Sequence, residues 1–257
     1  YLAHAALEPM NAVASVTADG AELWAGNQAP DVLQGLAARL LEIAPEKVRV
    51  HSTWIGGAFG RRTYMDFALE AVALSRALGA PVKVIWSRED DTRHDHYRPA
   101  AMAAMRADFG ADGKLLGWDA RIVAPSVMTT MVDVMLPVML PQWAPLGVGT
   151  VVKPLAAKYD PMLTEGVDSI PYAMPYLRVE GLVSDHGIPV GVWRSVGHSQ
   201  NAFFSESFVD EVAHGALADG QLLERRDVYL HVEVAGIGDD GGVLHGLEFD
   251  ARNIRVP

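Results

Sequence analysis

The sequence predicts an α+β fold, a two-layer α/β arrangement of mixed sheets with helices packed on one face. Short segments that alternate between apolar and polar residues, as half-buried strands do, come between longer segments with apolar residues at helical spacing. Turn dipeptides separate neighbouring strand candidates. Half of the 257 residues are hydrophobic, which is enough to build a sizeable core.

Residues 1–125 are expected to form a first α/β subdomain. Its predicted elements are strands at 12–17 and 21–26, a helix within 29–45, a strand at 47–55, a helix at 64–79, a strand at 80–87 and a hairpin at 103–123. Asp19-Gly20 and Asp112-Gly113 are the turn dipeptides of the two hairpins. Gly79 is the expected C-cap of the second helix.

Two further regions complete the predicted organisation, in which no internal repeat is evident. Residues 126–175 carry recurrent prolines with Met, Trp and Gly between them, which predicts an irregular connection. Its Met and Trp side chains are expected to line a substrate funnel, dock a partner subunit or fill the core. Residues 176–257 are expected to form a second α/β portion, with two strands before a helix at 199–220. The inward side of that helix is predicted to carry Phe204, Phe208, Val209 and Val212. Residues 227–257 receive no role, and a turn at Asp240-Gly241-Gly242 fits a strand pair there.

Composition excludes several classes of function. The net charge of -11 argues against non-specific binding to nucleic acid or to anionic membranes. The chain has no cysteine, so it forms no disulfide, thiolate metal site or protein-held iron–sulfur cluster. No apolar run reaches the roughly 18 residues of a membrane span, so no transmembrane segment is expected. The first residues lack a Met start and a signal peptide, which suggests an internal portion of a longer chain and leaves the compartment undecided.

The segment "WIGGAFGRR", residues 54–62, joins a predicted strand to a predicted helix. It lacks the Gly-Lys-Ser/Thr of a Walker A motif and the spacing of a Rossmann fingerprint. One interpretation is that the glycines only shape a tight turn. The other is that they let backbone N–H groups approach an anionic or oxo ligand. In that case Phe59 forms a wall, and Arg61 and Arg62 bind phosphate or carboxylate.

Five stretches in this order carry a resemblance: "HAALEPMNAVA", "LWAGNQAP", "VRVHSTWIGGAFGRR", "PVKVIWSREDDTRHDHYRP" and "PVGVWRSVGHSQNAFFSESFVDEVA". They resemble the large molybdopterin-binding subunit of molybdenum hydroxylases, the xanthine dehydrogenase and aldehyde oxidase family. Within it they are most similar to the isoquinoline 1-oxidoreductase and aldehyde dehydrogenase branch. The resemblance runs from residue 1 to about residue 226. It implies a molybdenum cofactor-binding type of α/β domain.

The resemblance also implies a cofactor, molybdopterin cytosine dinucleotide. Gln28 resembles the glutamine that hydrogen-bonds the apical oxygen ligand of molybdenum, and Phe59 and Gly60 resemble the loop that lies against the metal ligands and the pterin. Arg61 and Arg62 match the ending of that loop in this branch, where a contact with the cofactor phosphate is inferred. The residues expected to bind the cofactor are Gln28, Gly56, Gly57, Ala58, Phe59, Gly60, Arg61, Arg62, Arg194, Ser195, Val196 and Gly197.

The reaction implied is hydroxylation of an electron-poor carbon in an N-heteroaromatic compound or an aldehyde. Electrons then pass to [2Fe–2S] clusters on a small partner subunit. The general base of the family is a glutamate after Gly-Val-Gly, but here Gly-Val-Gly at 147–149 precedes Thr150. No catalytic residue is therefore identified, and the chain is expected to need the remainder of the large subunit for activity. The alternative is a non-catalytic α/β module that binds an anion or a partner.

Three other groups of polar residues suggest further sites. His94, Asp95 and His96 suggest a metal site, but alternate residues of an extended segment face opposite ways, which favours a structural charge cluster. That cluster would consist of Arg88, Asp90, Asp91, Arg93 and Arg98. Glu8 is expected to form a structural salt bridge rather than to act in catalysis. A hydrolase triad of Ser195, His198 and Asp210 is disfavoured because no nucleophile-elbow motif surrounds the serine.

Overall fold

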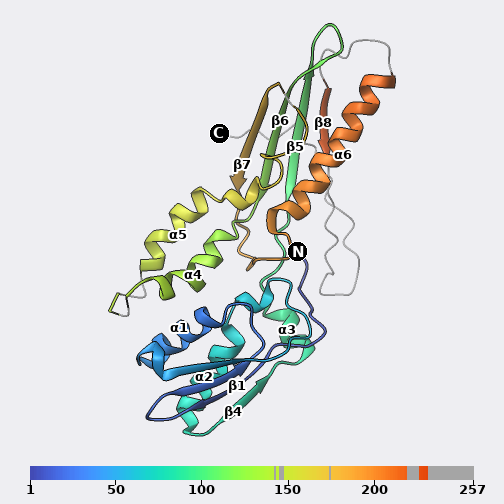
Figure 1. Ribbon diagram of the computed structural model, residues 1–257. Helices are drawn as coiled ribbons and strands as arrows, with labels where there is room; N and C mark the ends of the chain where they lie inside the picture. The colour runs from blue at the N-terminus through green and yellow to red at the C-terminus, as the bar shows by residue number, and fades with distance from the viewer. Residues whose placement is uncertain (142, 145–147, 174, 219–225, 231–257) are drawn as a thin grey trace.

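The computed structural model describes residues 1–141, 143–144, 148–173, 175–218 and 226–230. Two four-stranded mixed sheets, each with helices on one face, follow each other along the chain (Figure 1). This confirms the α+β class and the one-sided packing of helices on mixed sheets. The chain thus builds two separate hydrophobic cores, one for each sheet.

The first sheet has the strand order β3-β2-β1-β4. Its elements are β1 Asn11–Val16, β2 Ala21–Ala25, α1 Pro30–Leu41, β3 Val48–Ser52, α2 Asp66–Leu78 and β4 Val82–Ile85. β1 is antiparallel to β2 and β4, and β3 is parallel to β2. Ala12 and Ala14 face Ala25 and Leu23 across the hairpin, and all four side chains are buried under α1 and α2. Alternation of this kind leaves the other face of the strands only partly covered.

Local sequence signals set the ends of these elements. Pro30 occupies the first turn of α1, where its missing N–H has no helical partner to lose. Gly79 ends α2 in the left-handed conformation, with φ 63°, as predicted. The short helix α3 Arg88–Arg93 has Ser87 as its N-cap, which forms a capping box with Asp90.

The second sheet has the strand order β7-β6-β5-β8. Its elements are β5 Met102–Phe109, β6 Leu115–Ala124, β7 Leu177–Val183, α6 Val196–Ala218 and β8 Arg226–Leu230. The predicted inward face of α6 is confirmed, since Phe204 and Phe208 are fully buried and Val209 and Val212 pack against the same core. Where two strands were predicted before α6, the structure has β7 and an isolated bridge between Val190 and Tyr97.

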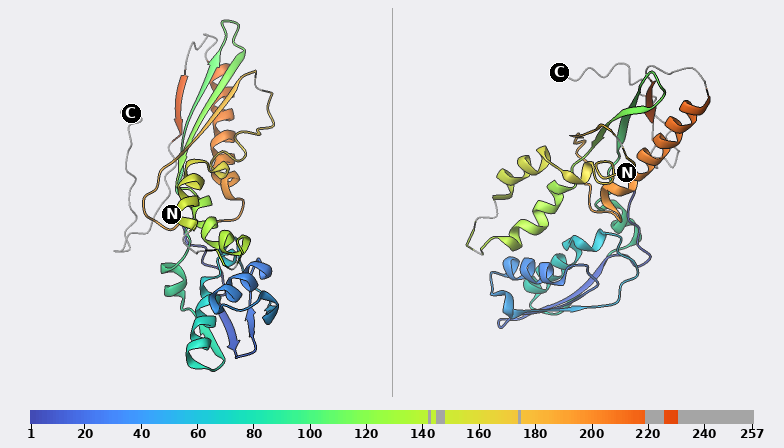
Figure 2. Two further views of the ribbon diagram at one scale, coloured as in Figure 1. Left: turned by 90° about the vertical axis from the view of Figure 1, so that its left-hand side faces the viewer. Right: turned by 45° about the horizontal axis from the view of Figure 1, so that its top comes forward.

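The middle of the chain corrects the predicted irregular connection. It contains two helices, α4 Met128–Met139 and α5 Val148–Lys158, with Pro137 and Pro154 inside them. α4 lies on α1 (Figure 2), and Arg39 of α1 donates to the carbonyls of Pro137 at 2.7 Å and Ala144 at 2.6 Å. Carbonyls in the last turn of α4 and in the segment after it are thus satisfied by a side chain of another helix. Met131 and Met135 pack against the first core, which supports core filling for this part of the Met-rich segment.

The two halves of the chain share one topology, although the sequence shows no repeat. In each half a central hairpin is followed by helix, parallel strand, helix and a final antiparallel strand, so β1-β2-α1-β3-α2-β4 matches β5-β6-α4/α5-β7-α6-β8. The hairpin at 103–123, expected in the first subdomain, therefore belongs to the second sheet. The predicted turn at 240–242 lies outside the described residues. In the part of the chain that the structure describes, no helix is long and apolar enough to cross a membrane.

Candidate cofactor-binding site

Two strand-to-helix connections meet where the two halves of the fold join. The glycine loop, residues 53–60, follows β3, and the arginine loop, residues 184–195, follows β7 at the equivalent place in the second half. The N–H of Arg194 donates to the carbonyl oxygen of Phe59 at 2.7 Å. A Cβ atom on Gly60 would lie 1.8 Å from the carbonyl oxygen of Val192, so only glycine permits this contact.

Both loops hold backbone conformations that ordinary residues rarely adopt. Phe59 has φ 54° in the glycine loop, and Ser195 and Val196 have φ 65° and 43° where the arginine loop enters α6. For a β-branched residue such as Val196 this conformation is an outlier. Strain of this kind persists only where the surroundings enforce it, and it concentrates at functional sites. The strain therefore marks the junction of the two loops as a candidate site.

Gln28 connects the turn after β2 to the same junction. Its backbone N–H donates to the carbonyl of Arg62 at 3.1 Å, and the N–H of Gly60 donates to its side-chain Oε1 at 3.2 Å. Because the Gly60 N–H can only donate, it is the Oε1 atom of Gln28, and not the Nε2 group, that faces Gly60. The Nε2 group of Gln28 keeps both of its N–H donors, with no acceptor among the described residues. The three predicted segments thus converge, and the glutamine presents donors there.

The glycine loop adds further donors. The N–H groups of Gly57, Ala58 and Phe59 have no acceptor in the described part of the chain, and Ala58 is buried. Adjacent unpaired amides in a loop with residues at positive φ form the kind of concavity that binds oxo and phosphate oxygens. Such oxygens only accept hydrogen bonds, so this donor set fits a molybdopterin group.

Arg62 supports the glycine loop from inside the protein. Its guanidinium donates to the carbonyls of Gly57 at 2.9 Å, Gly26 at 3.1 Å and Glu8 at 3.1 Å, and to the Glu8 carboxylate at 2.9 Å. Burial lowers the pKa of Arg62, and the charge of Glu8 acts in the opposite direction. The predicted phosphate contact of this side chain is therefore corrected, because the fully buried guanidinium holds the loop instead.

The same correction applies to Arg61. Its guanidinium forms two hydrogen bonds of 2.9 Å with Asp66, lies 3.1 Å from Asp95 and packs over the ring of Trp86. The side chain is fully buried, so it has no access to a bound phosphate. Arg194, by contrast, is exposed, and its guanidinium has no ion pair among the described residues. It is the arginine of the predicted set that remains available to an anionic group.

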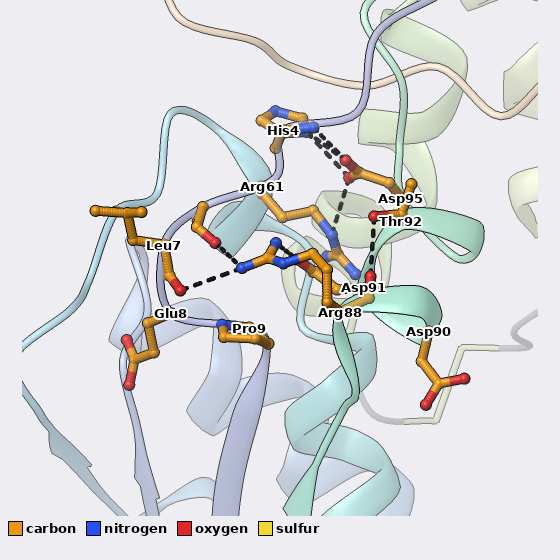
Figure 3. A network of polar contacts seen from close by, with 12 residues as sticks. His4, Leu7, Glu8, Pro9, Arg61, Arg88, Asp90, Asp91, Thr92 and Asp95 are labelled. Atoms are coloured by element: carbon orange, nitrogen blue, oxygen red, sulfur yellow. Dashed lines mark hydrogen bonds and ion pairs between the residues drawn. The ribbon is translucent and has the colours of Figure 1, made fainter. Parts of the chain in front are cut away.

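Glu8 forms the structural salt bridge that the sequence predicted. Its carboxylate pairs with Arg62 at 2.9 Å and accepts from the N–H of Gly56 at 2.8 Å and from Asn11 at 3.0 Å (Figure 3 shows its place beside the network). Partial burial acts to raise the pKa of Glu8, but these donors outweigh it and lower the pKa. The carboxylate is therefore ionised at neutral pH and ties the N-terminal segment to the glycine loop.

The other predicted clusters are resolved by their contacts. No group of three metal-ligating side chains exists among the described residues, so the metal interpretation of His94, Asp95 and His96 is not supported. Asp95 is buried, whereas His94 is exposed. The expected charge cluster includes the Arg88–Asp91 pair, which lies beside the main-chain carbonyl of Leu7 (Figure 3). In the disfavoured triad, Ser195 contacts Ser199 and His198 lies 3.4 Å from Glu165.

Tyr64, which no sequence pattern indicated, links the arginine loop to α4. The N–H of Val192 donates to the Tyr64 hydroxyl at 3.0 Å, and that hydroxyl contacts the Thr130 hydroxyl at 3.1 Å. Thr130 donates to the carbonyl of Val127 at 2.8 Å, so Tyr64 donates to Thr130. Burial raises the pKa of Tyr64, which keeps it protonated as this chain of hydrogen bonds requires. The partners lie 66 and 128 residues away, and no local pattern indicates them.

We expect Tyr64→Phe to lower the free energy of unfolding by about 1–3 kcal/mol, because it leaves the Val192 amide without an acceptor in a partly buried place. Chemical denaturation of the variant and the parent protein measures this difference. Tyr172→Phe is the matched control, since that hydroxyl contacts Glu206 at the surface and its loss is expected to cost less than about 0.5 kcal/mol. Equal effects of the two substitutions would contradict the assignment.

A small open pocket with a cavity volume of about 10 Å³ lies next to the arginine loop. Its walls come from the end of β6, the start of α4 and the start of α6, and include Trp193, Val196 and Met162. The guanidinium of Arg98, which also lines the pocket, lies 5.5 Å from the Trp193 ring centre. A cavity of this volume has room for about one water molecule.

The fold is that of an α/β molybdopterin cofactor-binding domain. Residues 1–140 match the family model described as the molybdopterin cofactor-binding domain, and the chain belongs to that family. The chain is 36% identical over 216 residues to the isoquinoline 1-oxidoreductase subunit beta of Brevundimonas diminuta, an alignment that covers 84% of this chain and 26% of that protein.

Two further similarities agree with this assignment. The chain is 33% identical over 113 residues to the aldehyde oxidoreductase molybdenum-binding subunit PaoC of Escherichia coli K12, covering 44% of this chain and 15% of that subunit. The solved structure of quinoline 2-oxidoreductase from Pseudomonas putida 86 matches the fold with a TM-score of 0.64 at 22% identity, over 84% of this chain and 25% of that one. The chain therefore spans about a quarter of the length of the isoquinoline and quinoline enzyme chains.

Proposed function

We propose that this chain is the cofactor-binding portion of the large subunit of a molybdenum oxidoreductase. The whole enzyme hydroxylates an electron-poor carbon of an N-heteroaromatic compound or an aldehyde. The observation that supports this most directly is the convergence of Gln28, the glycine loop and the arginine loop on one set of unpaired donors. The cofactor is molybdopterin cytosine dinucleotide in this proposal.

Each part of the junction has a distinct task. The bound cofactor supplies the two-electron oxidation of the substrate carbon. The amides of Gly57, Ala58 and Phe59 and the Nε2 group of Gln28 orient it through its oxygen atoms. Arg194 neutralises negative charge at the edge of the site. In this proposal the apolar wall beside Val196 contacts the ring or chain of the substrate.

Other parts of the enzyme complete the reaction. No cysteine in this chain can hold a [2Fe–2S] cluster, and in this proposal the clusters that accept the electrons lie on a small partner subunit. The general-base glutamate belongs to the remainder of the large subunit, and these residues alone are inactive. The alternative, a non-catalytic module that binds an anion, makes use of the same free donors and is an outcome of the following test.

The test uses the full-length protein that contains this chain, produced together with its partner in a host that matures molybdenum cofactors. We expect about one molybdenum per chain by mass spectrometry of the metal, and cytidine monophosphate on acid hydrolysis of the cofactor. Production in tungstate medium is the control and is expected to replace the molybdenum. A protein that contains no molybdenum but binds inorganic phosphate would support the non-catalytic module instead.

A further inference from the structure

We propose that His4, held by Asp95, is a positioning residue that fixes the arginine loop against the glycine loop. The proposal rests on the proposed function, because it treats this junction as the cofactor site. His4 belongs to the N-terminal segment, before the first strand, and reaches a residue 188 positions further along the chain. It acts through the backbone of Val192 and does not touch the cofactor.

The contacts of His4 are buried and specific. Its Nε2 lies 3.0 Å from the carbonyl oxygen of Val192, and its Nδ1 lies 3.0 Å from Asp95 Oδ1. The backbone N–H of His4 also donates to the Asp95 carboxylate (Figure 3). The ring stacks on Trp193 of the arginine loop, with the ring centres 4.4 Å apart. The side chains of His4 and Asp95 are each 1% exposed, so neither can meet a substrate directly.

The Val192 carbonyl settles the role of one nitrogen of the His4 ring. A carbonyl oxygen only accepts, so Nε2 carries a proton toward Val192. Asp95 also accepts from the N–H of His96 at 2.7 Å and lies 3.1 Å from Nε of Arg61. His4 therefore links the Val192 carbonyl to the buried side chain of Asp95, which is itself fixed by Arg61.

Fixing Val192 fixes the loop. Its N–H is bound by Tyr64, its carbonyl by His4, and its side chain packs against the core of the first half. Two residues later the Arg194 N–H reaches Phe59. Without His4 the Val192 carbonyl, which lies against Gly60, loses its donor in a partly buried place at a cost in free energy. The arginine loop then separates more readily from the glycine loop, and Arg194 and the Phe59 carbonyl lose their relative position.

The experiment compares His4→Ala and His4→Gln in the full-length protein, with hydrogen exchange of the segment 191–196 and molybdenum content as readouts. For His4→Ala we expect exchange in that segment to rise on the order of tenfold while a peptide from α2 is unchanged, and the molybdenum retained to fall. Glutamine keeps an N–H donor for Val192, so His4→Gln is expected to recover part of both. His51→Ala, which alters a histidine on β3 outside this network, is the control and is expected to change neither.

Unchanged exchange at 191–196 in folded His4→Ala would overturn the proposal, and so would equal acceleration in α2, which indicates a general loss of stability. If His4→Ala does not fold, His4→Gln decides. Hydrogen exchange raised only at 191–196 supports the positioning role of His4. Exchange equal to that of the parent protein, or raised throughout the chain, overturns it. A parent protein that contains no molybdenum would contradict the proposed function, independently of the exchange result. In that case the exchange data still report whether His4 fixes the loop.

Discussion

Gly60→Ala is expected to lower the free energy of unfolding by about 3 kcal/mol or more and to abolish cofactor retention in the full-length protein. The added Cβ would lie 1.8 Å from the Val192 carbonyl oxygen and 2.6 Å from its carbon. Both atoms belong to backbone that is held by Tyr64 and His4, so they cannot move aside cheaply. Gly60 also has φ 110°, which an alanine adopts only with strain.

Gly113→Ala separates the effect of the steric clash from the effect of the positive φ angle. Gly113 has φ 76° in the turn of the β5–β6 hairpin, and no atom lies within 4 Å of the place that an added Cβ would occupy. We expect it to lose only about 1 kcal/mol, from backbone strain alone, and to retain molybdenum. Thermal denaturation and metal content measure both variants. If Gly60→Ala behaved like Gly113→Ala, the two loops would not be in the close contact that the site requires.

Local patterns in the sequence were sufficient for much of the scaffold. The hairpin around Asp19-Gly20, the Gly79 cap of α2 and the inward face of α6 follow from short-range rules that the structure confirms. The same rules failed for α4 and α5, where internal prolines conceal the helices. α4 is stabilised by burial against α1 and by Arg39, contacts that join residues about a hundred positions apart.

The sequence predicted which segments meet at the junction, but not the contacts of each side chain. The glycines and Gln28 were expected at one place, and the structure brings them together. Arg61 and Arg62 were predicted to face a phosphate group, but each arginine is buried against carboxylates or carbonyls. Whether an arginine faces a ligand or the interior depends on distant partners such as Asp95, which a local motif does not reveal.

The repeated topology gives a physical reason for the position of the site. In each half a loop follows the edge strand that is parallel to its neighbour, β3 in the first half and β7 in the second. These two equivalent loops contact each other. Both carry non-glycine residues at positive φ, Phe59 in one and Ser195 in the other. Loops on rigid sheets can hold such strain because the cores on both sides fix their ends. The donors at the junction are thus set in place before a ligand binds.

Gln28→Glu is expected to lower kcat of the full-length enzyme by roughly 10²–10³-fold, within the range found when one preorganised donor is removed. Glutamate has nearly the same shape and still accepts from the Gly60 N–H, a contact of 3.2 Å in the parent protein. It removes the two free N–H donors and adds a negative charge beside the oxygen atoms of the proposed cofactor. The free energy of unfolding should change by less than about 0.5 kcal/mol, because Gln28 is exposed and its internal contact survives.

Gln34→Glu is the matched control, and we expect it to lower stability without changing kcat. Gln34 donates its Nε2 to the carbonyl of Val48 at 2.8 Å, away from the site, so the same substitution should cost about 1 kcal/mol of stability and leave kcat unchanged. Dye reduction with an aldehyde or an N-heteroaromatic substrate gives kcat, and molybdenum content corrects it for cofactor occupancy. Full kcat in Gln28→Glu at normal occupancy would show that the amide donors of Gln28 take no part in the reaction, because the substitution leaves the remaining architecture of the junction in place.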